Sequence, residues 1–131
     1  MRIPVLLVAV VGALVLGVPA ASGTTATGSA DGITVVVSLS DTATAGEPFT
    51  IAESIANTTD RAKLVRVTQT LEGPAGVLFS IRYPLIVPAG RTLSFSITYT
   101  FPAGVPPGTY ELTLTAGNAS ATAQTTVAAA A

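Results

Sequence analysis

Apolar and polar residues alternate along most of this chain with a period of two. The clearest stretch is TLSFSITYTF, residues 92–101, in which every second side chain is large and apolar and every residue between is Ser or Thr. Successive side chains of a β-strand point to opposite faces, so this pattern predicts a strand with one buried and one solvated face. A helix would scatter the same apolar residues around its circumference.

Weaker forms of this alternation predict six further strands. They are ITVVVSL (33–39), FTIAESIA (49–56), LVRVTQTL (64–71), FSIRY (79–83), TYELTLTA (109–116) and an Ala/Thr-rich stretch at 121–127. The last pattern is the weakest and fits either an edge strand or a frayed tail. Turn-forming Pro, Gly, Asn and Asp residues separate the segments. About seven short strands punctuated in this way predict an all-β sandwich.

Two polar residues interrupt the pattern. Glu53 and Gln69 fall in phase with apolar neighbours, so perfect alternation would bury both. An unpaired buried carboxylate is costly. We therefore expect a β-bulge or a position at the rim of the sandwich; the alternative is that these side chains point into a small cavity in the core.

The N-terminus has the layout of a secretory signal peptide over residues 1–22. A positive Met1-Arg2 precedes an uncharged, mainly apolar run of 14 residues (5–18), and small residues follow. A membrane-spanning helix needs roughly 20 apolar residues. We therefore expect cleavage near Ala21 or Gly23, a secreted or periplasmic location and no stable membrane insertion afterwards.

The rest of the chain divides by composition. Residues 23–31 contain no large apolar side chain and are predicted to be a flexible leader. The alternating segments place one sandwich domain at 32–128, and residues 129–131 are a short tail.

Missing residue types exclude several chemistries. The chain contains no Cys and no His, so it has no disulfide, no Ser–His–Asp or Cys–His nucleophile system and none of the usual zinc, copper or non-haem iron sites. No phosphate-binding glycine loop is present. A formal net charge of −1 gives no electrostatic footprint for nucleic acid. We expect no catalytic residue, no cofactor and no metal.

Charged residues leave two minor alternatives. A carboxylate pair for glycoside hydrolysis, or a calcium site, would have to come from dispersed acidic residues, namely Asp31, Asp41, Glu53, Asp60, Glu72 and Glu111. We expect these carboxylates to be scattered and solvated. The densest basic cluster is Arg61, Lys63 and Arg66. Strand parity separates Arg66 from the other two, which favours a role in solubility and edge protection.

The region from Gly46 to Ala116 resembles bacterial immunoglobulin-like domains of the CARDB type. The residues that carry the resemblance are GEPFTI (46–51), IANTT (55–59), VPAG (87–90) and FPAGVPPGTY (101–110). The resemblance implies an immunoglobulin-like β-sandwich of the kind found in secreted and cell-surface proteins. Residues 57–67 also faintly resemble a strand-turn-strand of periplasmic pilus-assembly chaperones.

These observations lead to three functional hypotheses. The first is an exported, non-enzymatic domain with an interaction or structural role at the cell exterior and with protein or cell-envelope polysaccharide as partner. Its binding surface would be the loops at one sandwich end or an exposed edge strand. The alternative is a secreted or periplasmic inhibitor or assembly chaperone with one protein client. The third is a hydrolase that uses Glu53 or Glu111.

Overall fold

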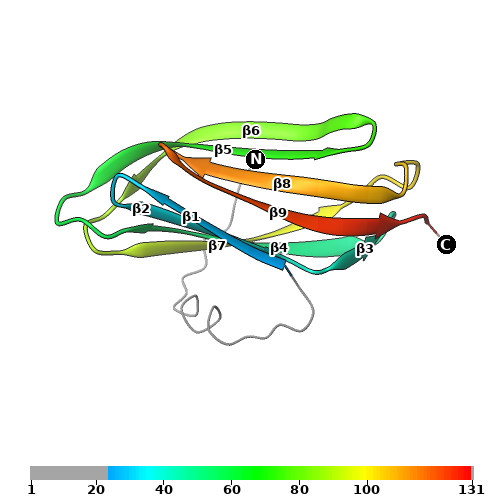
Figure 1. Ribbon diagram of the computed structural model, residues 1–131, viewed down its shortest axis with the longest axis horizontal. Helices are drawn as coiled ribbons and strands as arrows, with labels where there is room; N and C mark the ends of the chain where they lie inside the picture. Colours follow the sequence, from blue (N-terminus) through cyan, green and yellow to red (C-terminus); the bar gives the residue numbers. More distant parts are fainter. Residues whose placement is uncertain (1–23, 131) are drawn as a thin grey trace.

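The computed structural model describes residues 24–130 as two β-sheets packed face to face (Figure 1). Its strands are β1 (Thr24–Ala30), β2 (Ile33–Leu39), β3 (Thr42–Thr44), β4 (Pro48–Asn57), β5 (Lys63–Gly73), β6 (Gly76–Val87), β7 (Thr92–Thr100), β8 (Gly108–Ala116) and β9 (Ala119–Ala128). The predicted signal peptide lies outside the described residues. Within them, no helix is long and apolar enough to cross a membrane.

The strand order confirms the predicted sandwich. One sheet has the order β1-β2-β4-β7 and the other the order β3-β9-β8-β5-β6. All seven predicted strands are present, as β2 and β4 to β9. β3 is an addition of three residues that pairs in parallel with β9, and all other pairs are antiparallel. The pairs β1–β2, β5–β6 and β8–β9 are adjacent antiparallel strands of one sheet, and every other step along the sequence crosses to the opposite sheet.

The interior of the sandwich is built from the inward positions of the alternating strands. Fully buried side chains from both sheets meet there, including Val35, Val37, Ile51, Ile55, Val67, Leu71, Leu112 and Leu114. Because the side-chain period is two, strands such as β2, β7 and β8 contribute one apolar face to this layer and leave a mostly polar face on the other side.

The segment predicted as a flexible leader is a strand, and that prediction was wrong. β1 pairs with β2 along its whole length, from Thr24↔Leu39 to Ala30↔Ile33. Asp31 and Gly32 form the two-residue turn, with φ of 52° and 78°. Two consecutive positive φ angles fit a type I′ hairpin turn, for which Asp-Gly is a preferred sequence. The local turn thus orders a segment that has no large apolar residue.

β1 also closes one side of the sandwich by lying along β9. A Cβ on Gly28 would come 1.8 Å from the carbonyl oxygen of Ser120, so only glycine permits this approach. The hydroxyl of Thr24 donates a hydrogen bond to the carbonyl oxygen of Gln124, at 2.8 Å. Consequently β9, flanked by β8 and β3 and covered by β1, is an ordered strand and neither a sheet edge nor a frayed tail.

Tyr110 fixes the end of the sandwich where β8 begins. Its hydroxyl donates a hydrogen bond to the carbonyl oxygen of Pro106 at 2.5 Å, the arrangement called a tyrosine corner in immunoglobulin-like domains. Its ring packs edge-on against Phe101, with centroids 5.2 Å apart. A Cβ on Gly73 would lie 2.1 Å from the ring. Tyr110 therefore anchors this end of the sandwich.

We expect Tyr110→Phe to lower the free energy of unfolding by about 1 kcal/mol, because it removes one buried hydrogen bond and keeps the ring. Urea denaturation measures the change. Tyr99→Phe is the matched control, since no hydrogen bond of the Tyr99 hydroxyl occurs among residues 24–130 and its change should be smaller. Equal effects of the two substitutions would contradict this role of Tyr110.

Candidate functional site

Glu53 and Gln69 lie inside the core, so the expected bulge or rim position was wrong. Their side chains are only 4% and 1% exposed. Gln69 Nε2 donates a hydrogen bond of 2.7 Å to Glu53 Oε1, which joins β5 of one sheet to β4 of the other. The bulge in β5 lies further along, between Leu71 and Glu72. The two polar groups tolerate burial because each partners the other across the sandwich.

The buried carboxyl is neutral near pH 7. Burial raises the pKa of Glu53 from 4.5 to about 8. Its cross-strand neighbours in the sheet, Val37 and Phe95, are apolar, and Oε2 has no hydrogen-bond partner among the described residues. Gln69 Nε2 also lies 3.4 Å from the hydroxyl of Tyr83 on β6. Burial, followed by the nearby Glu53, raises the pKa of Tyr83 to about 12.

A protonated Glu53 makes stability depend on pH. Between pH 4.5 and about 8 the folded chain holds a proton that the unfolded chain has released. The contribution of the protonated Glu53 to the free energy of unfolding is therefore complete below pH 4.5 and is lost as pH rises through the folded pKa. The free energy of unfolding falls by up to about 1.4 kcal/mol per pH unit in this range.

Glu53→Gln should remove this slope, because the amide keeps an oxygen for Gln69 and does not ionise. Urea denaturation of both proteins across this pH range measures the difference. Glu47→Gln, at an exposed position, is the control for the loss of one carboxyl. If Glu53→Gln has the same pH dependence as the unsubstituted protein, Glu53 is not the titrating group.

The remaining carboxylates are mostly dispersed. Two of them are cross-strand neighbours, which their spacing in the sequence does not reveal. Glu72 and Glu111 stand directly opposite each other on β5 and β8. Both are on the outer face of the sheet, where Gln124 Nε2 donates to Glu111 Oε2 at 2.8 Å. Among the described residues, no three His, Cys, Asp or Glu side chains gather as a metal site would require. Glu53 is buried in the core and lies away from the Glu72–Glu111 pair.

The predicted basic cluster is divided as expected. Arg61 lies in the turn before β5, and its carbonyl oxygen accepts a hydrogen bond from Asn57 Nδ2 at 2.8 Å. Lys63 Nζ donates to the carbonyl oxygen of Asp31 at 2.7 Å, and Arg66 is exposed on the opposite face of β5. Two of the three residues thus support turns and hairpins at this end of the sandwich.

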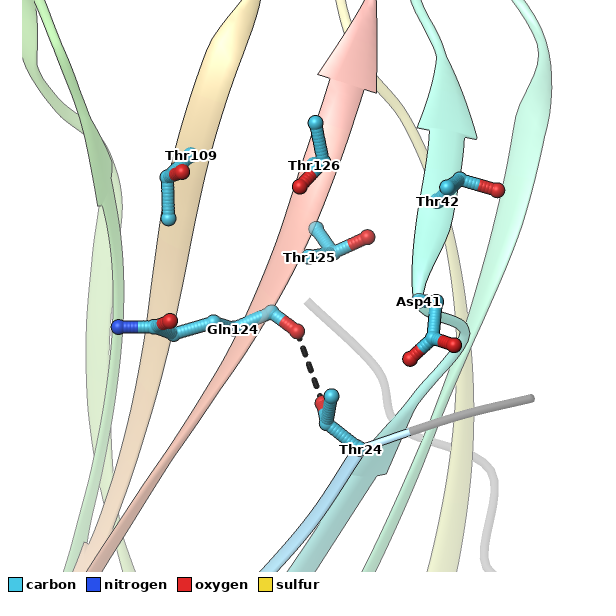
Figure 2. A pocket seen from close by; sticks show the side chains of 7 residues that line it. All are labelled: Thr24, Asp41, Thr42, Thr109, Gln124, Thr125 and Thr126. Carbon is cyan, nitrogen blue, oxygen red and sulfur yellow. Dashed lines mark hydrogen bonds between the residues drawn. The ribbon is translucent and has the colours of Figure 1, made fainter. Parts of the chain in front are cut away.

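An open cavity of about 290 Å³ lies where β9 passes between the first residue of β1 and β3. It is lined by Thr24, Asp41, Thr42, Thr109, Gln124, Thr125 and Thr126 (Figure 2). Figure 2 shows the Thr24 hydroxyl directed at the Gln124 carbonyl oxygen, to which it is hydrogen-bonded. The lining offers hydroxyls, one amide and a single carboxylate. It therefore has no second acidic group for acid–base chemistry.

The opposite side of the sandwich has two unpaired strand edges. β7 ends one sheet order and β6 ends the other, and no described strand pairs with the outer edge of either. Inward-facing apolar side chains are only half-buried along this side, including Phe79, Tyr83, Leu85, Leu93, Ile97 and Tyr99. Phe79 and Tyr99 meet edge to face across the two sheets, with centroids 5.2 Å apart.

Within residues 24–130, only one of the sheet edges lacks protection against pairing. β6 carries Arg82 and Pro84, two residue types that discourage strand addition. β3 has three residues, and β1 lies along β9. β7 presents nine residues with no charge and no proline, and its pairing with β4 has no register shift. The outer edge of β7 is therefore the candidate functional site, which we call the β7 edge.

Comparison with known proteins informs the fold alone. No protein-family model and no curated protein matches the sequence. A β-glucosidase from Listeria innocua in complex with isofagomine matches 76% of this chain with a TM-score of 0.60 and 14% identity, over 16% of its own length. A β-glucosidase from Erythrobacter marinus matches 82% of this chain with a TM-score of 0.52 and 12% identity, over 15% of its own length. This chain thus spans about a sixth of those enzymes.

Proposed function

We propose that this chain is an exported, non-enzymatic immunoglobulin-like domain that binds another polypeptide through the β7 edge. The observation that carries the proposal is the length and lack of protection of this edge. An unpaired edge supplies backbone donors and acceptors to an incoming strand, and side chains beside it select the partner. The half-buried Ile97 and Tyr99 provide such an apolar border.

The positions of the carboxylates support the non-enzymatic part of the proposal. Glu53 is held in a closed apolar interior, where it bonds to Gln69. Glu72 and Glu111 project from the open outer face of a sheet. A hydrolase needs its two carboxyl groups to flank a bound substrate in a water-excluding cleft. Neither arrangement does so.

A specific client is the second candidate function, and the same edge favours it. An inhibitor or assembly chaperone would hold one protein partner in a stoichiometric complex, whereas a general interaction module would retain several. Cell-envelope polysaccharide is the other partner class. It would be recognised by hydroxyl and carboxylate groups such as those around Asp41, and not by a strand edge.

Export rests on the charge and apolar pattern of residues 1–22. We expect the exported protein to begin near Ala21 or Gly23. Intact-mass measurement of protein recovered from the medium or periplasm determines its first residue. Recovery of a chain that retains Met1 and remains with the membrane would contradict export by a cleavable signal.

Binding is tested by placing a lysine on the β7 edge. Ile97→Lys puts an inward-facing charge beside the edge, where strand addition would desolvate it. The matched control is Ile81→Lys, which changes another half-buried inward residue, on β6. With envelope and culture-medium proteins from the parent organism, we expect Ile97→Lys to reduce retained partner at least tenfold and Ile81→Lys to leave it unchanged.

Three outcomes would contradict the proposal. They are retention of no protein by the unsubstituted chain, equal loss in both lysine variants, and retention of polysaccharide alone. Thermal unfolding of both variants checks that each is folded.

A further inference from the structure

The sequence of β7 is symmetric in polarity about its central residue. Counting outward from Ser96, the positions in both directions are apolar, hydroxyl, apolar and hydroxyl. The apolar positions are also complementary, because each aromatic residue on one side of Ser96 corresponds to an aliphatic residue on the other side. These pairs are Phe95 with Ile97 and Leu93 with Tyr99.

This symmetry matters for an antiparallel partner with the same sequence. When two β7 strands run antiparallel with Ser96 opposite Ser96, all nine residues find a partner. Phe95 then lies opposite Ile97, and Leu93 opposite Tyr99, on the inward face. Hydroxyl residues lie opposite hydroxyl residues on the outward face. Cross-strand aromatic–aliphatic pairs are among the favourable ones in sheets.

Neighbouring registers fit less well. Moving the centre of symmetry by one residue, to Phe95, leaves two β7 residues unpaired and places Tyr99 opposite Arg91, which is outside the strand. Register in sheets is specified by such matching of faces and pairs. The register centred on Ser96 is therefore the one that this strand favours with a copy of itself.

Charge supports a second copy as the occupant. β7 contains no ionisable residue except the phenol Tyr99, so two copies do not repel each other at the contact. A β6–β6 contact centred on Arg82 would instead bring two Arg82 side chains together, and Pro84 has no backbone N–H to donate to a partner strand. A two-fold contact uses the same surface on both partners and closes on itself, which prevents open-ended growth.

We propose that two copies of this chain associate through antiparallel pairing of their β7 edges, with Ser96 on the two-fold axis. The two four-stranded sheets then form one continuous sheet of eight strands. Neighbouring inward side chains cover Ile97 and Tyr99, which are half-buried in the single chain. This inference rests on the proposed function, since it names the partner of the same edge.

Single-cysteine variants test the register directly, because the chain has no cysteine of its own. Ser96→Cys places two thiols opposite each other on the axis, so mild oxidation should convert most of the protein to a disulfide-linked dimer. Thr98→Cys is the control on the same face of the same strand, and its side chain is more exposed. In the proposed register its two copies are four residues apart along the strand, roughly 14 Å. Disulfides need Cα atoms within about 7 Å, so Thr98→Cys should cross-link at least tenfold less.

A mixture of two variants checks the ends of the strand. Thr92 and Thr100 are both exposed and lie opposite each other in the proposed pair. Thr92→Cys and Thr100→Cys should each form no disulfide-linked dimer on oxidation when alone, and should form the mixed disulfide-linked dimer when combined. Sedimentation of the unsubstituted protein should show dimer that increases with concentration, that Ile97→Lys abolishes and that Ile81→Lys retains.

Two results would overturn self-pairing. One is equal cross-linking by Ser96→Cys and Thr98→Cys, which indicates random collision. The other is monomer at every concentration together with no cross-linking by Ser96→Cys. Neither decides the proposed function, because retention of a different protein that is sensitive to Ile97→Lys would still support binding at the β7 edge. Thermal unfolding of the reduced variants confirms that each is folded.

Discussion

The packing of inward-facing side chains between the two sheets is the interaction on which this fold depends. With no cysteine in the chain, no disulfide joins the sheets. Alternation gives most strands one apolar face, and burying that face fixes both the register and the orientation of the strand. The Glu53–Gln69 hydrogen bond crosses the same interior, so this polar contact between the sheets depends on that packing as well. The Tyr110 corner then secures one end of the layer.

The parts that could be predicted from sequence are those decided by local patterns. Alternation located the seven strands that carry large apolar residues. It missed β1 because Thr, Ala and Gly give no apolar face, although Asp31-Gly32 was a hairpin signal in the sequence. The prediction that Glu53 lies at a bulge or at the rim was wrong for another reason. Its partner lies on a different strand of the opposite sheet, and the pairing of distant strands is not encoded in the spacing around Glu53. The same limit hid the Glu72–Glu111 neighbours.

β1, which the alternation did not predict, also bears on where the proposed binding edge lies. β1 covers β9 on one side of the sandwich, and Gly28 permits the close approach. The other side is left with β6, which Arg82 and Pro84 protect, and with β7, which no residue of the described range 24–130 protects. Natural proteins usually blunt long exposed edges. An uncharged, regular nine-residue edge bordered by half-buried apolar side chains is consistent with a surface that receives another strand. The shared fold with segments of β-glucosidases adds no catalytic group to this surface.

The central claim is that two copies of this domain pair through their β7 edges. Residue-resolved amide hydrogen exchange, measured on the unsubstituted protein over a series of concentrations, tests it most directly. The account predicts that alternate β7 amides exchange rapidly in dilute protein, because they point away from β4, and become protected as concentration rises. The β6 amides should not change. Rapid exchange of the β7 amides at every concentration, or concentration-dependent protection confined to β6, would contradict the account.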